Sequence, residues 1–522
     1  MTGPKKSLFL LIFLFVIFLF SGYLRLYNLG YSDYQGDEIK AFFNPKVDGD
    51  YFQFLLDQRK GPNQFIVTGI FKGITNDFDN YALTRLPFAL AGFLSVIVFY
   101  FIVKRIFNEK TAIYSSIFFA TNGFLVAFSR IVQYQSFVIL FGLLAIYLYQ
   151  KFQETKKYYL ITLSFVSLAA ATLFHYDGLF FGLPILYWAI QELLNSKKPE
   201  SRKLLLNLIV AGLVFVVMLA SFYIPFVMNL TDKTKDYWLG RISGEVSNKV
   251  SSSYYLFTIY QPIYVIHFYI AIIGLGLALA FYPLISKYIK IKFLKDLEFN
   301  KNIINLLVWI LIPFAFLEGI VSIPGTHIYT YLIPTMILMG YGIDKAFEVI
   351  KNKALQILGY AALGGLALFL FLQANAIFVD HAKEYPWEDK KFLLFTLIRP
   401  SPVFHLSMFG FPYNREWKQI AEFLNQNPND YYSTNERVTV TRYLIKNPKD
   451  GNQARYYVFI ENPQMFTNDI SNSRARTFIA GNKPIKEIKT QSGNKVLIYE
   501  IPKNFSYSAP SSKTIISENL DE

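Results

Sequence analysis

The chain has 522 residues, of which 53% are hydrophobic and 17% are charged, and its mean hydropathy is +0.30. A soluble globular protein usually carries about 25% charged residues. This chain contains many windows of 18 or more residues without a charge, which is typical of transmembrane helices. The composition therefore excludes a soluble enzyme and predicts a polytopic α-helical membrane protein. The net charge of +14 requires no nucleic-acid partner, because Lys and Arg collect in the cytoplasmic loops of membrane proteins.

About eleven apolar segments are predicted to span the membrane. They cover residues 8–24, 82–103, 111–128, a fourth segment that ends near 150, 158–174, 178–194, 204–227, 262–286, 303–323, 328–344 and 354–379. The first segment is too long for the apolar region of a signal peptide and lacks a clear cleavage site, so we interpret it as an uncleaved span. Residues 28–80 form a large first loop. Segments 39–57 and 62–75 of this loop are predicted to be short amphipathic helices at the membrane interface.

The loops between these spans differ in charge, which predicts their orientation. The inner segments hold 20 Lys and Arg residues, at 5–6, 104–110, 151–157, 197–203, 287–301 and 345–353. The three short outer turns hold only Arg130. By the positive-inside rule, the N-terminus is cytoplasmic and residues 28–80, 228–261 and 380–522 face outward. We expect a multi-pass plasma-membrane protein, and the absence of cysteine fits a bacterial one.

The composition changes after the last predicted span. Apolar residues between 417 and 424 recur at helical spacing. Three further segments are predicted to be strands, at 438–440, 456–460 and 495–499. These patterns predict that a membrane domain, residues 1–379, is followed by a small extracytoplasmic α/β domain over 380–504. Residues 505–522 are Ser-rich and predicted to be disordered.

A pair of carboxylates lies just after the first span. Asp37 and Glu38 follow Gly36, which permits a sharp turn, and we expect both to lie just outside the membrane. Such a pair can bind a cation, pair with basic side chains or act as a general base. The dipeptide alone leaves a solvated acidic turn as the alternative interpretation.

The predicted topology places the other polar candidates on the same outer side. They are Lys60, Arg85, Arg130, Gln133, Gln135, His175, Asp177, Arg241 and His327. Glu318 lies inside a predicted span near that end, where a charged residue has either a function or a buried ion-pair partner. This layout suits sugar transfer from a lipid phosphate. Cations hold the phosphate and stabilise the leaving group, while a carboxylate base activates the acceptor hydroxyl on the opposite face of the sugar. One base and one cationic clamp imply a single inverting displacement.

Short motifs in the N-terminal two thirds of the chain resemble a known group of enzymes. They are Leu26–Gly30 followed by the Asp37–Glu38 pair, Lys60–Pro62, Arg85–Pro87 and Phe128–Arg130. In order and topology, residues 1–345 resemble family 39 of the GT-C glycosyltransferases. That family includes protein O-mannosyltransferases and is close to the aminoarabinose transferases of lipid A.

The resemblance implies a GT-C fold and an inverting glycosyltransferase. The enzyme would move a sugar from a polyprenyl-phosphate-linked donor to an acceptor hydroxyl on the outer face of the membrane. It implies Asp37 as the catalytic base, with Glu38 in support, and Lys60 as a contact to the donor phosphate. The further donor-phosphate candidates are Arg85, Arg241 and His327. The candidate contacts to the acceptor or the sugar are Arg130, Tyr134, Gln135, His175, Asp177 and Glu318.

Several of these candidates have structural alternatives. Arg241 can be a solvated loop residue, and His327 can cap a helix. Tyr134 and Gln135 can equally cap a span. Some relatives carry an acidic residue in this turn, where this chain has Gln133-Tyr134-Gln135 instead. This difference argues against an acidic or metal-binding role for the turn in this chain. No metal or other cofactor is expected to be required, because five histidines without an HExxH pattern do not indicate a zinc centre.

A transporter or flippase of a lipid-linked sugar is the alternative function. Such a protein should place polar residues near mid-membrane and often shows repeated halves, whereas here the ionisable residues cluster at one face and no repeat is evident. An oligosaccharyltransferase would carry a WWDYG-type motif in its soluble domain, and this sequence has none. The expected partners are a polyprenyl-phosphate-linked sugar donor, a protein, lipid or glycan acceptor, and membrane lipids.

Overall fold

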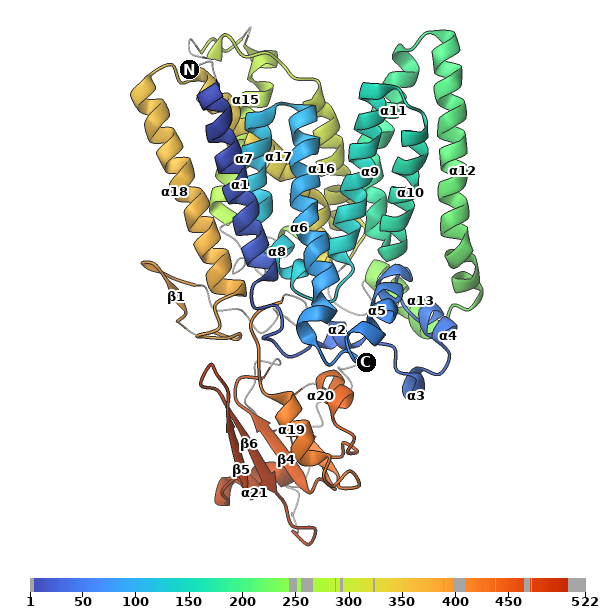
Figure 1. Ribbon diagram of the computed structural model, residues 1–522, viewed down its shortest axis with the longest axis vertical. Coiled ribbons are helices and arrows are strands. Elements are labelled where there is room, and N and C mark those ends of the chain that lie inside the picture. The colour runs from blue at the N-terminus through green and yellow to red at the C-terminus, as the bar shows by residue number, and fades with distance from the viewer. Residues whose placement is uncertain are drawn as a thin grey trace.

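The computed structural model describes residues 4–505, apart from short gaps. The gaps are residues 244–250, 255–265, 287, 292–293, 323, 388, 398–409, 437, 464–469 and 471. Helices form one large bundle, and a smaller α/β unit lies beyond the end of the bundle opposite the N-terminus (Figure 1). The tail predicted to be disordered, 505–522, lies outside the described residues except for Phe505.

A helix occupies each segment that the sequence predicts to span the membrane. The helices are α1 (Pro4–Leu26), α6 (Tyr81–Ile106), α7 (Glu109–Thr121) with α8 (Gly123–Ser129), α9 (Gln135–Thr155), α10 (Tyr159–Phe174), α11 (Gly182–Asn195), α12 (Lys198–Met228), α15 (Ile266–Ile285), α16 (Asn302–Gly319), α17 (Tyr329–Val349) and α18 (Lys353–Phe378). By length and composition, five of the described helices can cross a membrane, or six if the bent pair α7–α8 is one span. A mostly helical protein with several apolar helices is therefore confirmed, and the number of eleven spans stays a prediction.

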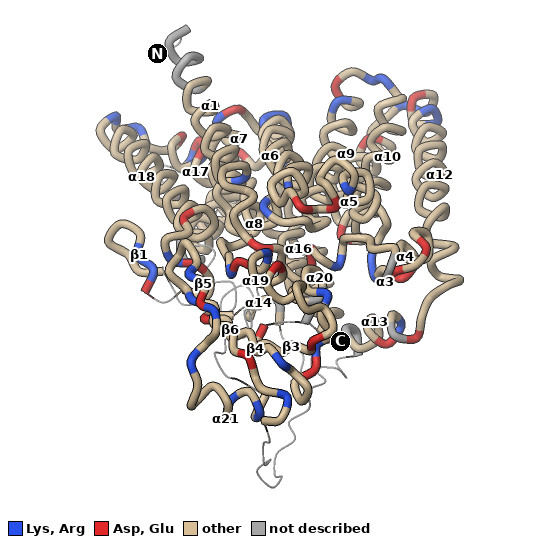
Figure 2. The backbone as a smooth tube through the Cα atoms, turned by 60° about the horizontal axis from the view of Figure 1, so that its bottom comes forward, with Lys and Arg blue, Asp and Glu red and all other residues tan. Residues whose placement is uncertain are grey.

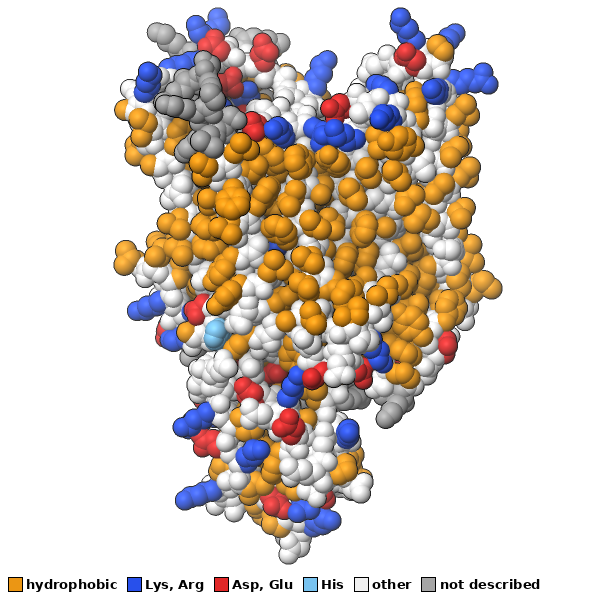
Figure 3. Space-filling model, in the orientation of Figure 1, with side chains coloured by type: hydrophobic (Ala, Val, Ile, Leu, Met, Phe, Trp, Pro, Cys, Tyr) orange, Lys and Arg blue, Asp and Glu red, His pale blue; other side chains and the backbone are white. Residues whose placement is uncertain are grey.

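The surface of the bundle is divided into zones along its long axis. Figure 3 shows hydrophobic side chains around the middle of the bundle and Lys and Arg side chains gathered at the end where α1 begins. On α12, Leu213 and Val217 are 60% and 66% exposed. Apolar side chains exposed in this way over several turns suit contact with lipid rather than water.

The helix ends on the opposite side meet around the first loop, residues 28–80. Helix α9 packs against both α6 and α10, and the Phe137 and Phe174 rings stack at 4.7 Å between the α9 and α10 ends. Helix α10 stops where His175 adopts an extended backbone (φ −164°, ψ 146°). Two 3-10 helices follow at this level, η1 (Tyr176–Phe181) before α11 and η5 (Gly325–Ile328) before α17. Polar groups from distant segments are thereby brought to one end of the bundle.

The first loop contains four short helices. They are α2 (Gly36–Ile39), α3 (Pro45–Asp48), α4 (Tyr51–Leu56) and α5 (Asn63–Ile74). Helix α5 agrees with the prediction for 62–75, but the single helix predicted over 39–57 is wrong. The chain breaks there because Gly49 adopts a positive φ of 68°, and the Asp50 side chain then accepts the Gln53 N–H to start α4.

The α/β unit is built on a four-stranded sheet of order β3-β4-β6-β5. Its elements are α19 (Trp417–Leu424), β3 (Tyr432–Thr434), α20 (Val438–Leu444), β4 (Tyr456–Ile460), α21 (Ser473–Gly481), β5 (Lys486–Lys489) and β6 (Lys495–Glu500). Only β3 and β4 pair in parallel. The strand predicted at 438–440 is wrong, because this segment forms α20 in the crossover that two parallel strands require. A short hairpin, β1 (Lys391–Phe392) and β2 (Phe395–Thr396), lies between α18 and this unit.

A buried polar junction connects the α/β unit to the first loop. Arg415 is fully buried in an ion pair with Glu384, and Tyr31 donates to the same carboxylate at 2.7 Å. The Asp33 side chain accepts the Arg415 backbone N–H at 2.6 Å, and burial raises the pKa of Asp33 to about 7. Outside this junction, charges of both signs are dispersed over the α/β unit (Figure 2). The junction fixes the backbone four residues before Asp37.

Candidate active site

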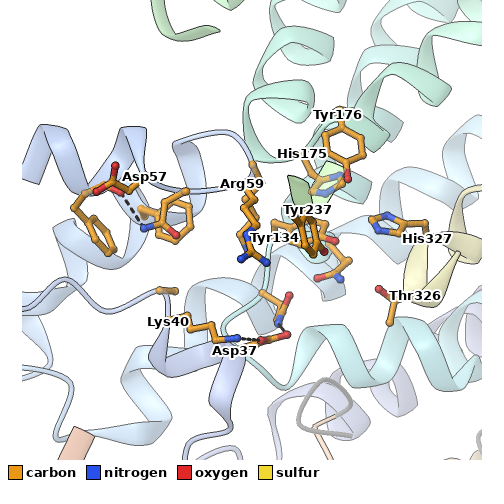
Figure 4. A pocket seen from close by; sticks show the side chains of 18 of the residues that line it. Asp37, Lys40, Asp57, Arg59, Tyr134, His175, Tyr176, Tyr237, Thr326 and His327 are labelled. Atoms are coloured by element: carbon orange, nitrogen blue, oxygen red, sulfur yellow. Dashed lines mark hydrogen bonds and ion pairs between the residues drawn. The ribbon is translucent and has the colours of Figure 1, made fainter. Parts of the chain in front are cut away.

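A cavity of about 730 Å³ lies where the first loop meets the ends of α8 and α10 (Figure 4). Its lining residues are Asp37, Lys40, Ala41, Asp48, Phe54, Asp57, Gln58, Arg59, Lys60, Phe65, Gln133, Tyr134, Gln135, His175, Tyr176, Tyr237, Gly325, Thr326 and His327. The first loop supplies the carboxylates and cations. The helix ends supply amides, aromatic rings and histidines, so the cavity offers groups suited to an anionic, hydroxyl-rich ligand.

Asp37 presents its carboxylate to this cavity from α2. Its side chain is 32% exposed. Gln133 donates its side-chain N–H to Asp37 Oδ2 at 3.2 Å, and Lys40 Nζ lies 3.5 Å from Oδ1 (Figure 4). These two weak contacts orient the carboxylate and leave acceptor capacity for a ligand hydroxyl.

Glu38 and Arg85 lie next to the cavity but do not line it. Glu38 is fully buried, and its carboxylate accepts hydrogen bonds from both Nε and Nη2 of Arg85 at 2.8 Å. The backbone N–H groups of Gln35 and Val132 complete its shell at 2.9 and 3.0 Å. The remaining Arg85 donors go to backbone carbonyls within residues 29–33. The geometry therefore corrects one expectation, because Arg85 has no donor left for a phosphate. Glu38, which was expected to support Asp37, holds the loop together through its pair with Arg85.

Lys60 lies on the cavity wall, next to Gly61, which comes unusually close to the backbone of α10. A Cβ built on Gly61 would lie 1.9 Å from the Leu173 carbonyl oxygen, so only glycine allows the loop to approach the end of α10 this closely. Lys60 Nζ lies 4.6 Å from the Tyr134 ring centre and has no ion-pair partner among the described residues. Burial lowers the pKa of Lys60 to about 8, although the nearby charge of Asp37 opposes this effect.

Arg59 is a second cation that the sequence reasoning missed. Its guanidinium carbon lies 4.0 Å from the Tyr237 ring centre, and the described part of the chain offers it no carboxylate partner. Its position beside Lys60 in the sequence was a signal.

His175, Asp177 and His327 form a buried cluster on another wall. Asp177 contacts His327 Nδ1 at 2.7 Å and His175 Nδ1 at 3.2 Å. Burial lowers the pKa of His175 to about 4. Burial alone would raise the pKa of Asp177, but the two histidines lower it below its usual range. The Tyr134 ring stacks on His175 at 4.2 Å. Among the described residues, this cluster has a donor set that could hold a metal ion.

The remaining candidates divide into those on the cavity and those away from it. Gln135 lines the cavity, and its side-chain carbonyl oxygen is buried with no partner among the described residues. Arg130 does not line it: its guanidinium donates to the carbonyls of Leu24 and Tyr27 at 2.9 and 3.0 Å. Among the described residues, Glu318 accepts the Ser253 backbone N–H at 3.3 Å and has no ion-pair partner, so the described contacts do not include the buried ion pair that was one of its two expected roles. Arg241 belongs to α13 (Asp232–Ser243), but its side chain lies outside the described residues.

Comparisons with known proteins agree with this fold. Residues 60–222 match a family model described as dolichyl-phosphate-mannose-protein mannosyltransferase. ArnT from Cupriavidus metallidurans bound to undecaprenyl phosphate is similar with a TM-score of 0.54 at 12% identity, covering 95% of this chain and 98% of that chain. The oligosaccharyltransferase AglB from Archaeoglobus fulgidus, in complex with an inhibitory peptide and a dolichol-phosphate, gives 0.50 at 12% identity over 87% and 70%. No curated protein sequence matches the chain significantly.

The chain resembles the GT-C glycosyltransferases. The match to the mannosyltransferase model and the similarity to ArnT confirm the expected resemblance to the protein O-mannosyltransferase and ArnT type. The matched segment of this chain begins at Lys60 and ends before α13, so it includes His175 but neither Asp37 nor His327. At 12% identity the solved structures show the fold alone, and the role of each side chain rests on its own geometry.

Proposed function

We propose that this protein transfers a sugar from a polyprenyl-phosphate-linked donor to an acceptor hydroxyl. The observation that carries the proposal is that one cavity holds an accessible carboxylate, Asp37, together with two cations, Lys60 and Arg59, that have no carboxylate partner in the part of the chain that the structure describes. Sugar transfer from a lipid phosphate needs this combination of a base and a phosphate clamp.

The cationic wall suits the phosphate of the donor. Lys60 is a compact point charge, and Arg59 can offer two parallel N–H groups to phosphate oxygens. As the bond from the sugar to the phosphate breaks, negative charge grows on the departing phosphate. Both cations would stabilise this charge more strongly in the transition state than in the bound donor.

Asp37 is the best candidate for the base. Asp48 and Asp57 also line the cavity, but each already accepts a hydrogen bond at 2.7 Å, from the Asn44 N–H and from the Gln53 side chain respectively. Asp37 lies deeper, beside Gln133 and within electrostatic reach of Lys60. It would take the proton of the acceptor hydroxyl as that oxygen attacks the sugar. With Asp37 acting as the base rather than as a nucleophile, the reaction is a single displacement with inversion at the sugar carbon.

The outer face of the membrane is the proposed location of this reaction. The first loop, which lines the cavity, lies at the end of the bundle opposite the start of α1 (Figure 1). Lys and Arg side chains gather at the end where α1 begins (Figure 3), and the positive-inside rule places that basic end in the cytoplasm. Alkaline phosphatase fused after residue 400 should be active in a bacterial cell, whereas fusions after Arg105 and Lys203 should be inactive. The reverse pattern would contradict this orientation and the outward-facing α/β unit.

A donor-cleavage assay tests the function directly. Purified protein is incubated with short-chain polyprenyl-phosphate sugars and a mixture of peptide, lipid and glycan acceptors, and the released polyprenyl phosphate is measured. We expect release that depends on acceptor and that is lost in the Asp37→Asn variant. Release that Asp37→Asn leaves unchanged would contradict the assignment of the base. Movement of intact donor across vesicle membranes without cleavage would favour a flippase instead.

A further inference from the structure

The cluster of His175, Asp177 and His327 is assembled from two separate segments. His175 follows α10, Asp177 lies in η1, and His327 lies in η5, about 150 residues further along the chain. The side chains nevertheless converge: each offers one ligand atom, and these three atoms lie within 4.8 Å of one another.

The cluster is buried but borders the cavity. Asp177, His175 and His327 are 2%, 4% and 8% exposed. Both histidines line the cavity, whereas the carboxylate lies behind them. A ligand from the cavity could therefore reach a group held between the two imidazoles, while bulk water would have little access to the carboxylate.

The donor set matches the preferences of one class of ion. Two imidazole nitrogens and one carboxylate oxygen are typical of sites for divalent transition metals, and zinc in particular. A set of three protein ligands leaves a fourth position for water or substrate, as in catalytic rather than structural zinc sites. A sequence search for HExxH misses such a site, because its ligands are not on one helix.

The observed contacts are close to those of a coordination shell. Bonds of about 2.0–2.1 Å in a tetrahedral shell separate neighbouring ligand atoms by about 3.3 Å. The corresponding separations here are 2.7 Å for His327 Nδ1 to Asp177 and 3.2 Å for His175 Nδ1 to Asp177. An ion would replace two hydrogen bonds, the one from His327 to the Asp177 carboxylate and the one from the Asp177 backbone N–H to His175 Nδ1 at 3.2 Å. Its binding would require small shifts of the side chains and would release a proton.

The surroundings also hold one of the rings in place. The Tyr134 ring is stacked on His175 with an interplanar angle of 9° and a centroid distance of 4.2 Å. A ligand ring that is fixed by packing loses little freedom on binding an ion.

We propose that His175, Asp177 and His327 bind one divalent transition-metal ion, for which Zn²⁺ is the best match. Binding of the ion does not depend on the proposed function. Its role does: if the cavity holds a lipid-linked sugar phosphate, the ion adds a Lewis acid to the wall that faces it, beside the cationic clamp of Lys60 and Arg59.

Metal binding to the full-length protein in detergent tests the proposal without any donor. The affinity tag is removed, the protein is stripped with a chelator, and Zn²⁺ is titrated by calorimetry with the bound metal counted by mass spectrometry. We expect one equivalent in the wild type and a loss of affinity of about 100-fold or more in His175→Ala and His327→Ala. Co²⁺ should give the visible absorption of a tetrahedral site. The matched control is His381→Ala, because His381 contacts Asn28 and does not line the cavity.

Each outcome decides between the proposals. No stoichiometric Zn²⁺ or Co²⁺ in the wild type, or undiminished binding in both histidine variants, would overturn the metal site and leave a hydrogen-bonded cluster. If the alanine variants fail to fold, Asp177→Asn keeps the shape and should still weaken binding. Stoichiometric metal without sugar transfer would count against the proposed function only. Transfer without metal binding would count against this inference only.

Discussion

Asp37 and Glu38 are adjacent in the sequence but belong to two different regions of the molecule. Asp37 borders the open cavity with a side chain that is 32% exposed. Glu38 belongs to a closed polar cluster in which Arg85 and two backbone N–H groups use its acceptor capacity. Consecutive residues of a helix point about 100° apart, so α2 directs one carboxylate to each region. The comparison shows that a carboxylate can serve catalysis only where a substrate can reach it and an acceptor site remains free.

The largest effect should follow from Asp37→Asn. The amide keeps the shape of the side chain but cannot accept the proton of the acceptor hydroxyl. We expect the rate of transfer to fall by about 10²–10⁴-fold, the usual share of general base catalysis, with little change in donor affinity. Single-turnover kinetics and a separate donor-binding titration measure the two quantities.

Thermal unfolding provides the control for this prediction. Because Asp37 makes only weak contacts, Asp37→Asn should unfold near the wild-type temperature. Near-normal single-turnover rates in this variant would show that Asp37 is not the base.

The second effect concerns stability rather than rate. Glu38→Gln would leave the Arg85 guanidinium buried without its counter-ion. Breaking a buried ion pair in this way costs about 3–5 kcal/mol. We therefore expect a clear loss of thermal stability in Glu38→Gln, with any loss of transfer in proportion to the fraction unfolded. A fully stable Glu38→Gln protein that cannot transfer sugar would reverse the roles of the two carboxylates.

Much of the fold could be predicted because apolar length and loop charge are local signals. Each uncharged segment became a helix, and two of the three predicted strands formed. The failures occurred where tertiary context decides. The segment 438–440 has β-branched residues, yet the parallel pairing of β3 and β4 makes it part of a crossover helix. The helical periodicity over 39–57 predicted one helix, because it gives no sign of the positive φ at Gly49 that breaks the chain there.

The site was predictable only in part. Asp37, after the turn at Gly36, and Lys60, in the Lys60–Pro62 motif, both line one cavity, and their roles stay predictions. The sequence does not show that Arg85 uses all five of its donors within the protein, whereas Arg59 faces the cavity. Which partner a cation meets depends on contacts between distant segments, and these are set by packing rather than by composition.

A smaller effect is expected from Lys60→Ala, which removes one half of the phosphate clamp. We expect kcat/KM for the donor to fall by an amount equivalent to about 1.5–3 kcal/mol of transition-state stabilisation, the scale of a charge-assisted hydrogen bond. Lys72→Ala is the matched control, because Lys72 lies in the same loop but outside the cavity, 3.4 Å from Asp77. Equal kcat/KM values in the two variants would remove Lys60 from the site.

The smallest effect is a dependence on pH that distinguishes the cationic wall from the carboxylate side. Burial lowers the pKa of Lys60 to about 8, so the ammonium is charged below pH 8 and progressively neutral above it. A lipid phosphodiester keeps its single negative charge throughout this range, which leaves the protein as the source of any change. We therefore expect kcat/KM for the donor, which reports the free protein, to fall as pH rises through about 8, at most about tenfold per pH unit. In Lys60→Arg the guanidinium stays charged and this alkaline limb should disappear, while the rate in Asp37→Asn should stay low at every pH. An unchanged alkaline limb in Lys60→Arg would assign the titration to a different group and would leave Arg59 as the cation that holds the phosphate.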